Sequence, residues 1–207
     1  MKLTVPNQLT LLRIFLTPIF IILFLKRTPL HQLLASIIYF IASLTDWYDG
    51  WYARKFGVIT RWGQFMDPLA DKILVSSALI LFAIQHYVFG WMVGIIIVRD
   101  FIVTSLRLYA LYVGKPIVTH IVAKWKTFAQ MLTIFGILIF IDFRNYMFPD
   151  APPYTPQYFD VIGIAMAIVT LLTIISGTIY LYENWEVALS ALRYLGRFFR
   201  GKAESSG

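Results

Sequence analysis

The chain has 207 residues, of which 59% are hydrophobic and 14% charged, and its formal net charge is +7. An average soluble domain carries roughly 25% charged residues, so this composition excludes an ordinary soluble core and predicts a lipid-facing exterior. The chain has no cysteine, which excludes disulfides, thiol catalysis and thiolate metal ligands. The positive charge is typical of the cytoplasmic face of a membrane protein beside anionic lipids, and no basic run interleaved with aromatic residues indicates nucleic-acid binding.

Six stretches are apolar enough to cross a membrane, since a span needs about 20 mainly apolar residues. We therefore predict an all-α integral membrane protein whose residues 1–184 form one domain of six transmembrane helices. Residues 185–207 are expected to form a cytoplasmic segment, in which Trp185–Phe199 mixes large apolar side chains with arginines as an interfacial amphipathic helix does. The expected spans are Leu9–Leu25, Leu33–Tyr52, Phe65–Tyr87, Trp91–Tyr112, Phe128–Phe143 and Phe159–Tyr182.

Lysine and arginine are distributed unequally between the two sides of these spans. The side opposite the termini has only Lys26, Arg27 and Arg144 in its loops, and these are offset by Asp142, Asp150 and Asp160. The positive-inside rule therefore places both termini in the cytoplasm. We expect the membrane to be a bacterial inner or plasma membrane, with the active site on its cytoplasmic side. The basic residues on the terminal side are Lys2, Arg54, Lys55, Arg61, Lys115, Lys124, Lys126, Arg193, Arg197, Arg200 and Lys202.

Four aspartates lie within or at the ends of two predicted spans, where a charged side chain has a high free-energy cost. Asp46 and Asp49 are three residues apart at the end of the second span, and Asp67 and Asp71 are four apart at the start of the third. Both spacings put a pair on one helix face, and a short loop lets the two antiparallel helices turn these pairs toward each other. An ionisable residue costs about 2.5 kcal/mol or more at the centre of a span, so something must offset the charge. Hard divalent cations do so, and Mg²⁺ typically joins carboxylates to substrate phosphates.

Neighbouring residues support a phosphate-containing ligand. Gly50 and Ala53 keep one helix face small, so a planar ligand can approach the backbone, and Arg54 supplies a fork for phosphate. For Asp67 there is an alternative role, because Pro68 suits the first turn of a helix and Asp67 would then be its N-cap. That role does not exclude metal binding.

The spacing from Asp46 to Asp71 reads D-x-x-D-G-x-x-A-R, then eight residues, then G-x-x-x-D-x-x-x-D. It resembles the signature of the CDP-alcohol phosphotransferases. The resemblance implies a six-helix fold, usually dimeric, with a polar cavity that opens to the cytoplasm. It also implies that Asp46, Asp49, Asp67 and Asp71 hold a centre of Mg²⁺ or Mn²⁺, often two ions, and that Asp71 takes the proton of the acceptor alcohol. On the same grounds, the residues expected to bind the CDP group are Gly50, Ala53, Arg54, Thr60 and Gly63.

The beginning of the chain agrees with this resemblance. The segment from Pro6 to Arg13 looks like the family's amino-terminal P-N-x-L-T-x-x-R. Asn7, Thr10 and Arg13 recur every three residues and share one helix face, so they are expected to meet the nucleotide diphosphate together. The alternative is an ordinary helix start with an interfacial arginine.

Basic residues in the fourth and fifth spans predict where the acceptor binds. Arginines within an apolar helix normally face a cavity or a partner, and converging Arg and Lys suit a phosphate dianion. The alternative for Arg99 is pairing with Asp100 or with the aspartate cluster. The segments resemble the family branch whose donor is CDP-diacylglycerol and whose acceptor is sn-glycerol 3-phosphate, although that branch often has Glu at the position of Asp100. The residues expected to hold the acceptor phosphate are Arg99, Arg107, Lys124 and Lys126.

The expected reaction is attack by an alcohol oxygen on the CDP-linked phosphorus, which expels CMP and forms phosphatidylglycerolphosphate. Another acceptor, such as serine, an inositol phosphate or phosphatidylglycerol, is an alternative with the same chemistry. A cation transporter with a carboxylate site is an alternative of another class, which predicts broken helices at the membrane midplane.

Overall fold

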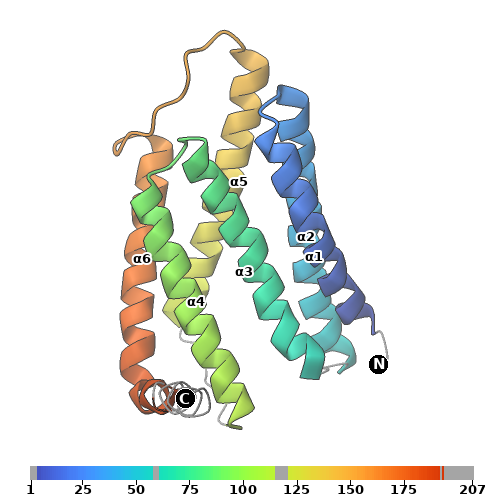
Figure 1. Ribbon diagram of the computed structural model, residues 1–207, viewed down its shortest axis with the longest axis vertical. Helices are drawn as coiled ribbons and strands as arrows, with labels where there is room; N and C mark the ends of the chain where they lie inside the picture. The colour runs from blue at the N-terminus through green and yellow to red at the C-terminus, as the bar shows by residue number, and fades with distance from the viewer. Residues whose placement is uncertain (1–3, 58–60, 115–120, 192, 194–207) are drawn as a thin grey trace, which may run out of the picture.

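A computed structural model of the chain describes residues 4–57, 61–114, 121–191 and 193. The regular structure of these residues is entirely helical, which confirms the all-α part of the predicted fold. The long helices run alternately up and down in one bundle (Figure 1), and residues 185–191 form a short helical segment after a turn at Asn184. The long helices are α1 (Val5–Leu25), α2 (Pro29–Phe56), α3 (Arg61–Ile84), α4 (Gly90–Tyr112), α5 (Ile121–Met147) and α6 (Val161–Glu183). Of the expected amphipathic helix, Leu192 and residues 194–199 lie outside the described part of the chain.

Local sequence sets several of the helix ends. Thr28 caps α2 by accepting a hydrogen bond from the backbone N–H of His31, and Pro29 occupies the first turn. The same helix ends at Gly57, whose φ of 64° is left-handed and suits a residue without a Cβ. Asp160 caps α6 through a 2.6 Å hydrogen bond from the N–H of Gly163. These caps fix where the chain reverses and therefore which residues lie at each end of the bundle.

The start of α3 differs from the sequence prediction. The helix begins at Arg61, so Asp67 and Pro68 lie inside it, and the N-cap role considered for Asp67 is wrong. The helix accepts Pro68 by giving up one backbone hydrogen bond, because proline has no N–H to donate to the preceding turn. Asp67 and Asp71 are consequently on one continuous helix, a turn apart.

The bundle is packed tightly in one half and more openly in the other. α1 packs against both α2 and α3, while α4 packs against α3 and α6, and α5 against α6 and α2. Near the end where α1 finishes, aromatic rings fill the centre: Phe20 lies 5.3 Å from Tyr39 and Phe24 lies 5.6 Å from Phe82, measured between ring centroids. Within the described residues α2 and α4 make no contact, and this separation leaves room for a cavity.

The exterior of the bundle is apolar. Phe15, Val98 and Phe128 are each more than half exposed. Soluble monomers rarely expose large apolar surfaces, so these side chains are expected to face lipid. Among the described residues, α1, α5 and α6 are long and apolar enough to cross a membrane. The chain is therefore an integral membrane protein. The charged residues of the candidate site are concentrated on α2, α3 and α4, which lowers the hydropathy of those helices.

Candidate active site

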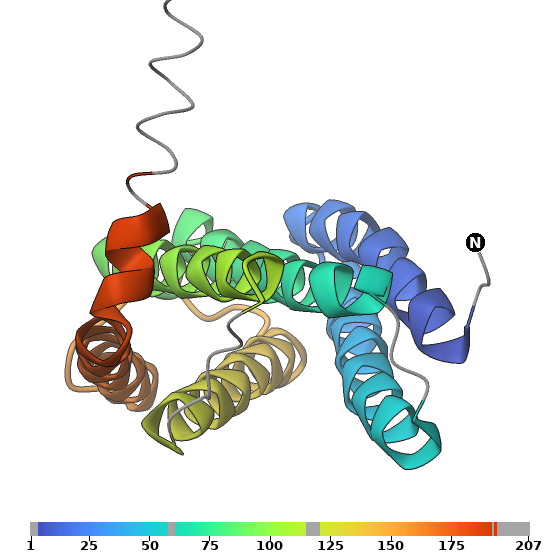
Figure 2. The same ribbon diagram turned by 90° about the horizontal axis from the view of Figure 1, so that it is seen from below.

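A cavity of about 500 Å³ lies between α2, α3, α4 and α5. Its lining residues on α2 and α3 come from the second half of α2 and the first half of α3, and these segments lie toward the end of the bundle where α1 begins and α6 ends (Figures 1 and 2). One wall carries acidic side chains and the opposite wall carries arginines. From α2 and α3 the lining residues include Asp46, Asp49, Gly50, Asp67, Asp71 and Lys72, and from α4 and α5 they include Arg99, Thr104, Arg107, Ala123 and Thr127.

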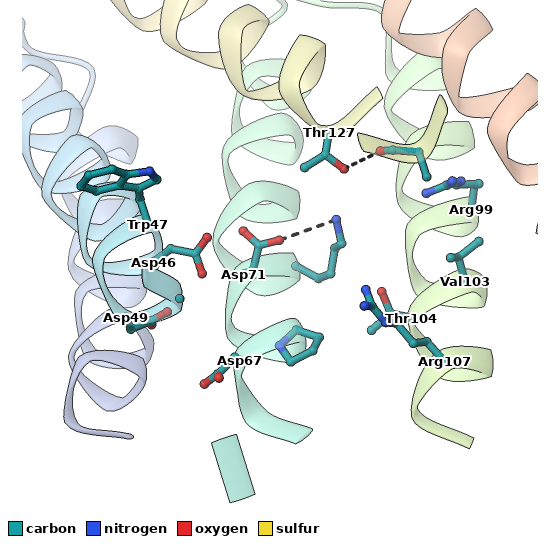
Figure 3. A pocket seen from close by; sticks show the side chains of 14 residues that line it. Asp46, Trp47, Asp49, Asp67, Asp71, Arg99, Val103, Thr104, Arg107 and Thr127 are labelled. Atoms are coloured by element: carbon teal, nitrogen blue, oxygen red, sulfur yellow. Dashed lines mark hydrogen bonds and ion pairs between the residues drawn. The ribbon is translucent and has the colours of Figure 1, made fainter. Parts of the chain in front are cut away.

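The acidic wall joins both predicted aspartate pairs. Asp46 on α2 and Asp71 on α3 point toward one another, as Figure 3 shows, and Asp49 and Asp67 lie below them in that view. All four carboxylates line the same cavity although 25 residues separate the first from the last. The structure thus brings the two predicted pairs together at one cavity, and their role in metal binding stays a prediction.

The first helix supports this wall from behind. Arg13 is completely buried and reaches two aspartates: its Nη2 donates to Oδ2 of Asp49 at 2.7 Å, and its Nη1 is paired with Oδ1 of Asp46 at 2.5 Å. The hydroxyl of Thr10 donates to Oδ1 of Asp67 at 2.5 Å. Asn7 is buried on the same helix face. None of the three is among the residues that line the cavity. Arg13 and Thr10 contact carboxylates of the acidic wall, and contact of all three residues with a nucleotide stays a prediction.

The other residues predicted to bind CDP differ in where they lie, and two of them cannot be described fully. Gly50 lines the cavity, Ala53 follows it by one turn on α2, and Gly63 is buried near the start of α3. The side chain of Arg54 and the whole of Thr60 lie outside the described residues.

Of the four residues predicted to hold the acceptor phosphate, two line the cavity and two do not. Arg99 and Arg107 line the cavity from α4. Arg99 is fixed by two partners, since Nη1 donates to Oδ1 of Asp100 at 3.1 Å and Nη2 donates to the hydroxyl of Ser176 at 2.9 Å. Its pairing with Asp100, considered from sequence as an alternative, therefore coexists with a place on the cavity wall.

The two lysines of α5 do not line the cavity. Lys124 is exposed on the outer side of the helix. Lys126 is completely buried, where it donates to Oδ1 of Asp100 and, at 2.6 Å, to Oε1 of Gln130. The sequence prediction treated both lysines as equivalent because it could not tell which face of α5 turns inward.

Lys72 is a site residue that the sequence prediction missed. It lines the cavity, and its Nζ lies 3.7 Å from Oδ2 of Asp71 and donates to Oδ2 of Asp100 at 3.3 Å. The available signal was a lysine directly after the last aspartate of the motif, in a helix that is otherwise largely apolar.

The comparison with known families gives a direct result. The model of the CDP-alcohol phosphatidyltransferase family matches residues 3–175. The chain belongs to this family. It is 38% identical over 194 residues to the CDP-diacylglycerol–glycerol-3-phosphate 3-phosphatidyltransferase of Bacillus subtilis strain 168, a match that covers 87% of this chain and 95% of that protein.

Two further relatives carry the same enzyme name. The protein of Haemophilus influenzae is 38% identical over 151 residues, covering 71% of this chain and 80% of the relative. The protein of Wigglesworthia glossinidia brevipalpis is 40% identical over 143 residues, covering 67% and 78%. The family predicted from the aspartate spacing is thus confirmed. Its rival, the cation transporter, predicts broken helices, whereas α2, α3 and α4 run unbroken past the charged residues.

The site of this CDP-alcohol phosphatidyltransferase has a donor set suited to a hard divalent cation. Its acidic wall offers eight carboxylate oxygens, the ligands that Mg²⁺ and Mn²⁺ prefer. Arg13 offsets part of this charge, but Asp67 and Asp71 receive no arginine in the described structure. As the described side chains stand, no three acidic or histidine residues form a complete ligand set, so the carboxylates would have to turn toward a bound ion.

Proposed function

We propose that this protein transfers the phosphatidyl group of CDP-diacylglycerol to sn-glycerol 3-phosphate, which yields phosphatidylglycerolphosphate and CMP in phospholipid biosynthesis. The observation that carries the proposal is the pair of opposed walls: four aspartates face two arginines across one cavity in an apolar bundle. The names of the relatives support both substrates.

The reaction divides between the two walls. The acceptor hydroxyl attacks the phosphorus of the donor, the bond from that phosphorus to the CMP oxygen breaks, and the hydroxyl proton passes to Asp71. Asp71 suits this role because it lines the cavity and, unlike Asp46 and Asp49, is not held by Arg13. A divalent cation held by Asp46, Asp49, Asp67 and Asp71 would screen the pyrophosphate and stabilise charge on the leaving CMP.

Residues behind the acidic wall keep it in place. Arg13 and Thr10 fix three of the four aspartates from α1, so these carboxylates are oriented before a ligand arrives. Preorganised groups need no reorganisation during the reaction, which is where they contribute to catalysis. Gly50 leaves space beside them for the nucleotide.

Arg99 and Arg107 favour a phosphorylated acceptor. Guanidinium groups bind phosphate through paired hydrogen bonds, and two of them on one wall match a dianion better than an uncharged alcohol or serine. The acceptor phosphate is therefore placed against α4, with its glycerol hydroxyl toward Asp71.

Six membrane spans and a cytoplasmic site are part of the proposal. α2, α3 and α4 have 28, 24 and 23 residues, each enough for a span of about 20. Charged residues of these helices line the cavity, and this lowers the free-energy cost of placing them within the membrane compared with a position facing lipid. The excess of Lys and Arg on the terminal side supports its cytoplasmic location, where soluble glycerol phosphates are available. We also propose a homodimer, as the family resemblance implies, to be tested by light scattering in detergent.

An acceptor panel tests the function. Purified protein is incubated with CDP-diacylglycerol, Mg²⁺ or Mn²⁺ and one acceptor at a time, while CMP release and lipid product are measured. We expect phosphatidylglycerolphosphate with glycerol 3-phosphate, and loss of turnover when EDTA removes the metal. CMP release with serine, inositol phosphate or phosphatidylglycerol in its place would overturn the acceptor, and full activity in EDTA would overturn the metal centre.

A further inference from the structure

We propose that Asp100 is a positioning residue for the acceptor subsite, and that Lys72, rather than Lys126, is the lysine that meets the acceptor phosphate. This inference rests on the proposed function, because it concerns how the same cavity recognises its phosphorylated acceptor.

Asp100 is the centre of a buried charge network. Its side chain is 2% exposed, and its two oxygens accept hydrogen bonds from three cations on three helices. Lys72 of α3 binds Oδ2, while Arg99 of α4 and Lys126 of α5 bind Oδ1. Asp100 is thus one negative charge shared by three positive charges, and Lys72 has a second carboxylate, Asp71, at 3.7 Å. The described network retains an excess of positive charge, which favours a phosphate anion.

The two lysines bound to Asp100 differ in what else they touch. Lys126 is fully buried, is also held by Gln130, and does not line the cavity. Lys72 lines the cavity, and its two carboxylate partners are more distant, at 3.3 Å and 3.7 Å. A lysine held by long contacts at a cavity wall can turn to a ligand phosphate, whereas Lys126 would first have to break two short buried bonds.

Asp100 also separates Lys72 from the proposed base. The Nζ of Lys72 lies nearer to Asp100 than to Asp71, by 3.3 Å against 3.7 Å. Without the Asp100 charge, Asp71 would be the remaining anionic partner of Lys72 in the described structure, and the pair would close. Arg99 would lose one of its two anchors at the same time and keep only Ser176. The first change would draw Lys72 away from the place where the acceptor phosphate binds, and the second would leave Arg99 less firmly positioned there.

The two lysines provide a matched experiment, because they share a residue type and a partner and differ in access to the cavity. Lys72→Met and Lys126→Met are compared by measuring KM for glycerol 3-phosphate and for CDP-diacylglycerol separately. We expect Lys72→Met to raise KM for glycerol 3-phosphate about 10-fold or more, as loss of a charged hydrogen bond does, and to change KM for the lipid donor little. Lys126→Met should lower thermal stability and raise KM for glycerol 3-phosphate far less than Lys72→Met does, because Lys126 does not line the cavity. An equal rise in KM for glycerol 3-phosphate in both variants would overturn the assignment of Lys72.

Asp100 is tested by charge and rescue. Asp100→Asn should raise KM for glycerol 3-phosphate and lower kcat, and Asp100→Glu, which keeps the charge, should recover most of both. If Asp100→Asn does not fold, the double variant Asp100→Asn with Lys126→Met removes both charges of the buried pair and allows the same measurement. Lower stability with unchanged KM for glycerol 3-phosphate would reduce Asp100 to a structural role. A wild-type protein inactive with glycerol 3-phosphate would instead overturn the proposed function, so the two failures are distinguishable.

Discussion

The Nη2 atom of Arg13 donates a 2.7 Å hydrogen bond to Oδ2 of Asp49, and both side chains are buried between α1 and α2. The other terminal nitrogen of the same guanidinium is paired with Asp46, so one arginine holds both aspartates of the α2 pair. A residue that sequence places beside the nucleotide therefore also acts on the acidic wall itself. The positive charge of Arg13 reduces the repulsion between the carboxylates of Asp46 and Asp49 when no metal ion is bound to them.

Loss of this arginine should make stability depend on metal. Arg13→Gln leaves the buried carboxylate of Asp49 and the partly exposed carboxylate of Asp46 without their cation. Breaking a buried pair such as Arg13–Asp49 costs about 3–5 kcal/mol. We expect a large fall in the thermal midpoint, partly restored by Mg²⁺ or Mn²⁺ because a ligand of the folded state stabilises it. Thermal unfolding in detergent, with added metal and with EDTA, measures both effects. Arg27→Gln, in an exposed turn at the other end of the bundle, is the control. An unchanged midpoint in Arg13→Gln would contradict the role.

Replacement of the proposed base should abolish turnover. Asp71→Asn keeps the size of the side chain but cannot take a proton, and general bases typically contribute 10²- to 10⁴-fold. We expect kcat for CMP release to fall by roughly that factor, while binding of CDP-diacylglycerol is largely retained. Asp150→Asn, in the exposed loop after α5, should have wild-type activity. Wild-type turnover by Asp71→Asn would show that another group accepts the proton.

A glycine of α6 makes room for Arg99. A Cβ placed on Gly177 would lie 3.0 Å from Cγ of Arg99, closer than ordinary van der Waals contact. Gly177→Ala should force the arginine side chain to shift, and because an off-rotamer side chain costs about 1 kcal/mol, KM for glycerol 3-phosphate should rise about fivefold. KM for CDP-diacylglycerol should not change.

The matched control is Gly136→Ala, since a Cβ there meets nothing within 4 Å. Both substitutions place alanine in a helix, where it is more favourable than glycine, so neither should unfold the protein. A similar rise in KM for both variants would show that the effect does not pass through Arg99.

Membrane orientation can be measured cleanly because the natural chain has no cysteine. Lys55→Cys lies near the end of α2 on the site side, and Asp150→Cys lies in the loop at the opposite end of the bundle (Figure 1). With an impermeant maleimide on intact cells, we expect Asp150→Cys to be labelled at once and Lys55→Cys only after permeabilisation. The reverse labelling pattern would place the active site on the outer side of the membrane. Labelling of both cysteines in intact cells would exclude an odd number of membrane spans between positions 55 and 150.

Much of the site was predictable because it depends on local periodicity. The three- and four-residue spacings of Asp46, Asp49, Asp67 and Asp71 put each pair on one helix face whatever surrounds them. The short connection between the two helices then made the pairs neighbours. The same spacing pointed to the family before any fold was considered, and the family comparison confirms it.

Tertiary structure decided the partners of the basic residues. Sequence gives Lys72, Lys126 and Arg13 the same type of charge in similar apolar surroundings, but packing makes the first line the cavity and buries the other two against carboxylates. The early start of α3, which places Asp67 within a helix instead of at its cap, likewise follows from the folded chain. Helical spacing determines which residues share a face, whereas the neighbouring helices determine what that face meets, and the charge of a buried side chain is balanced only by what it meets.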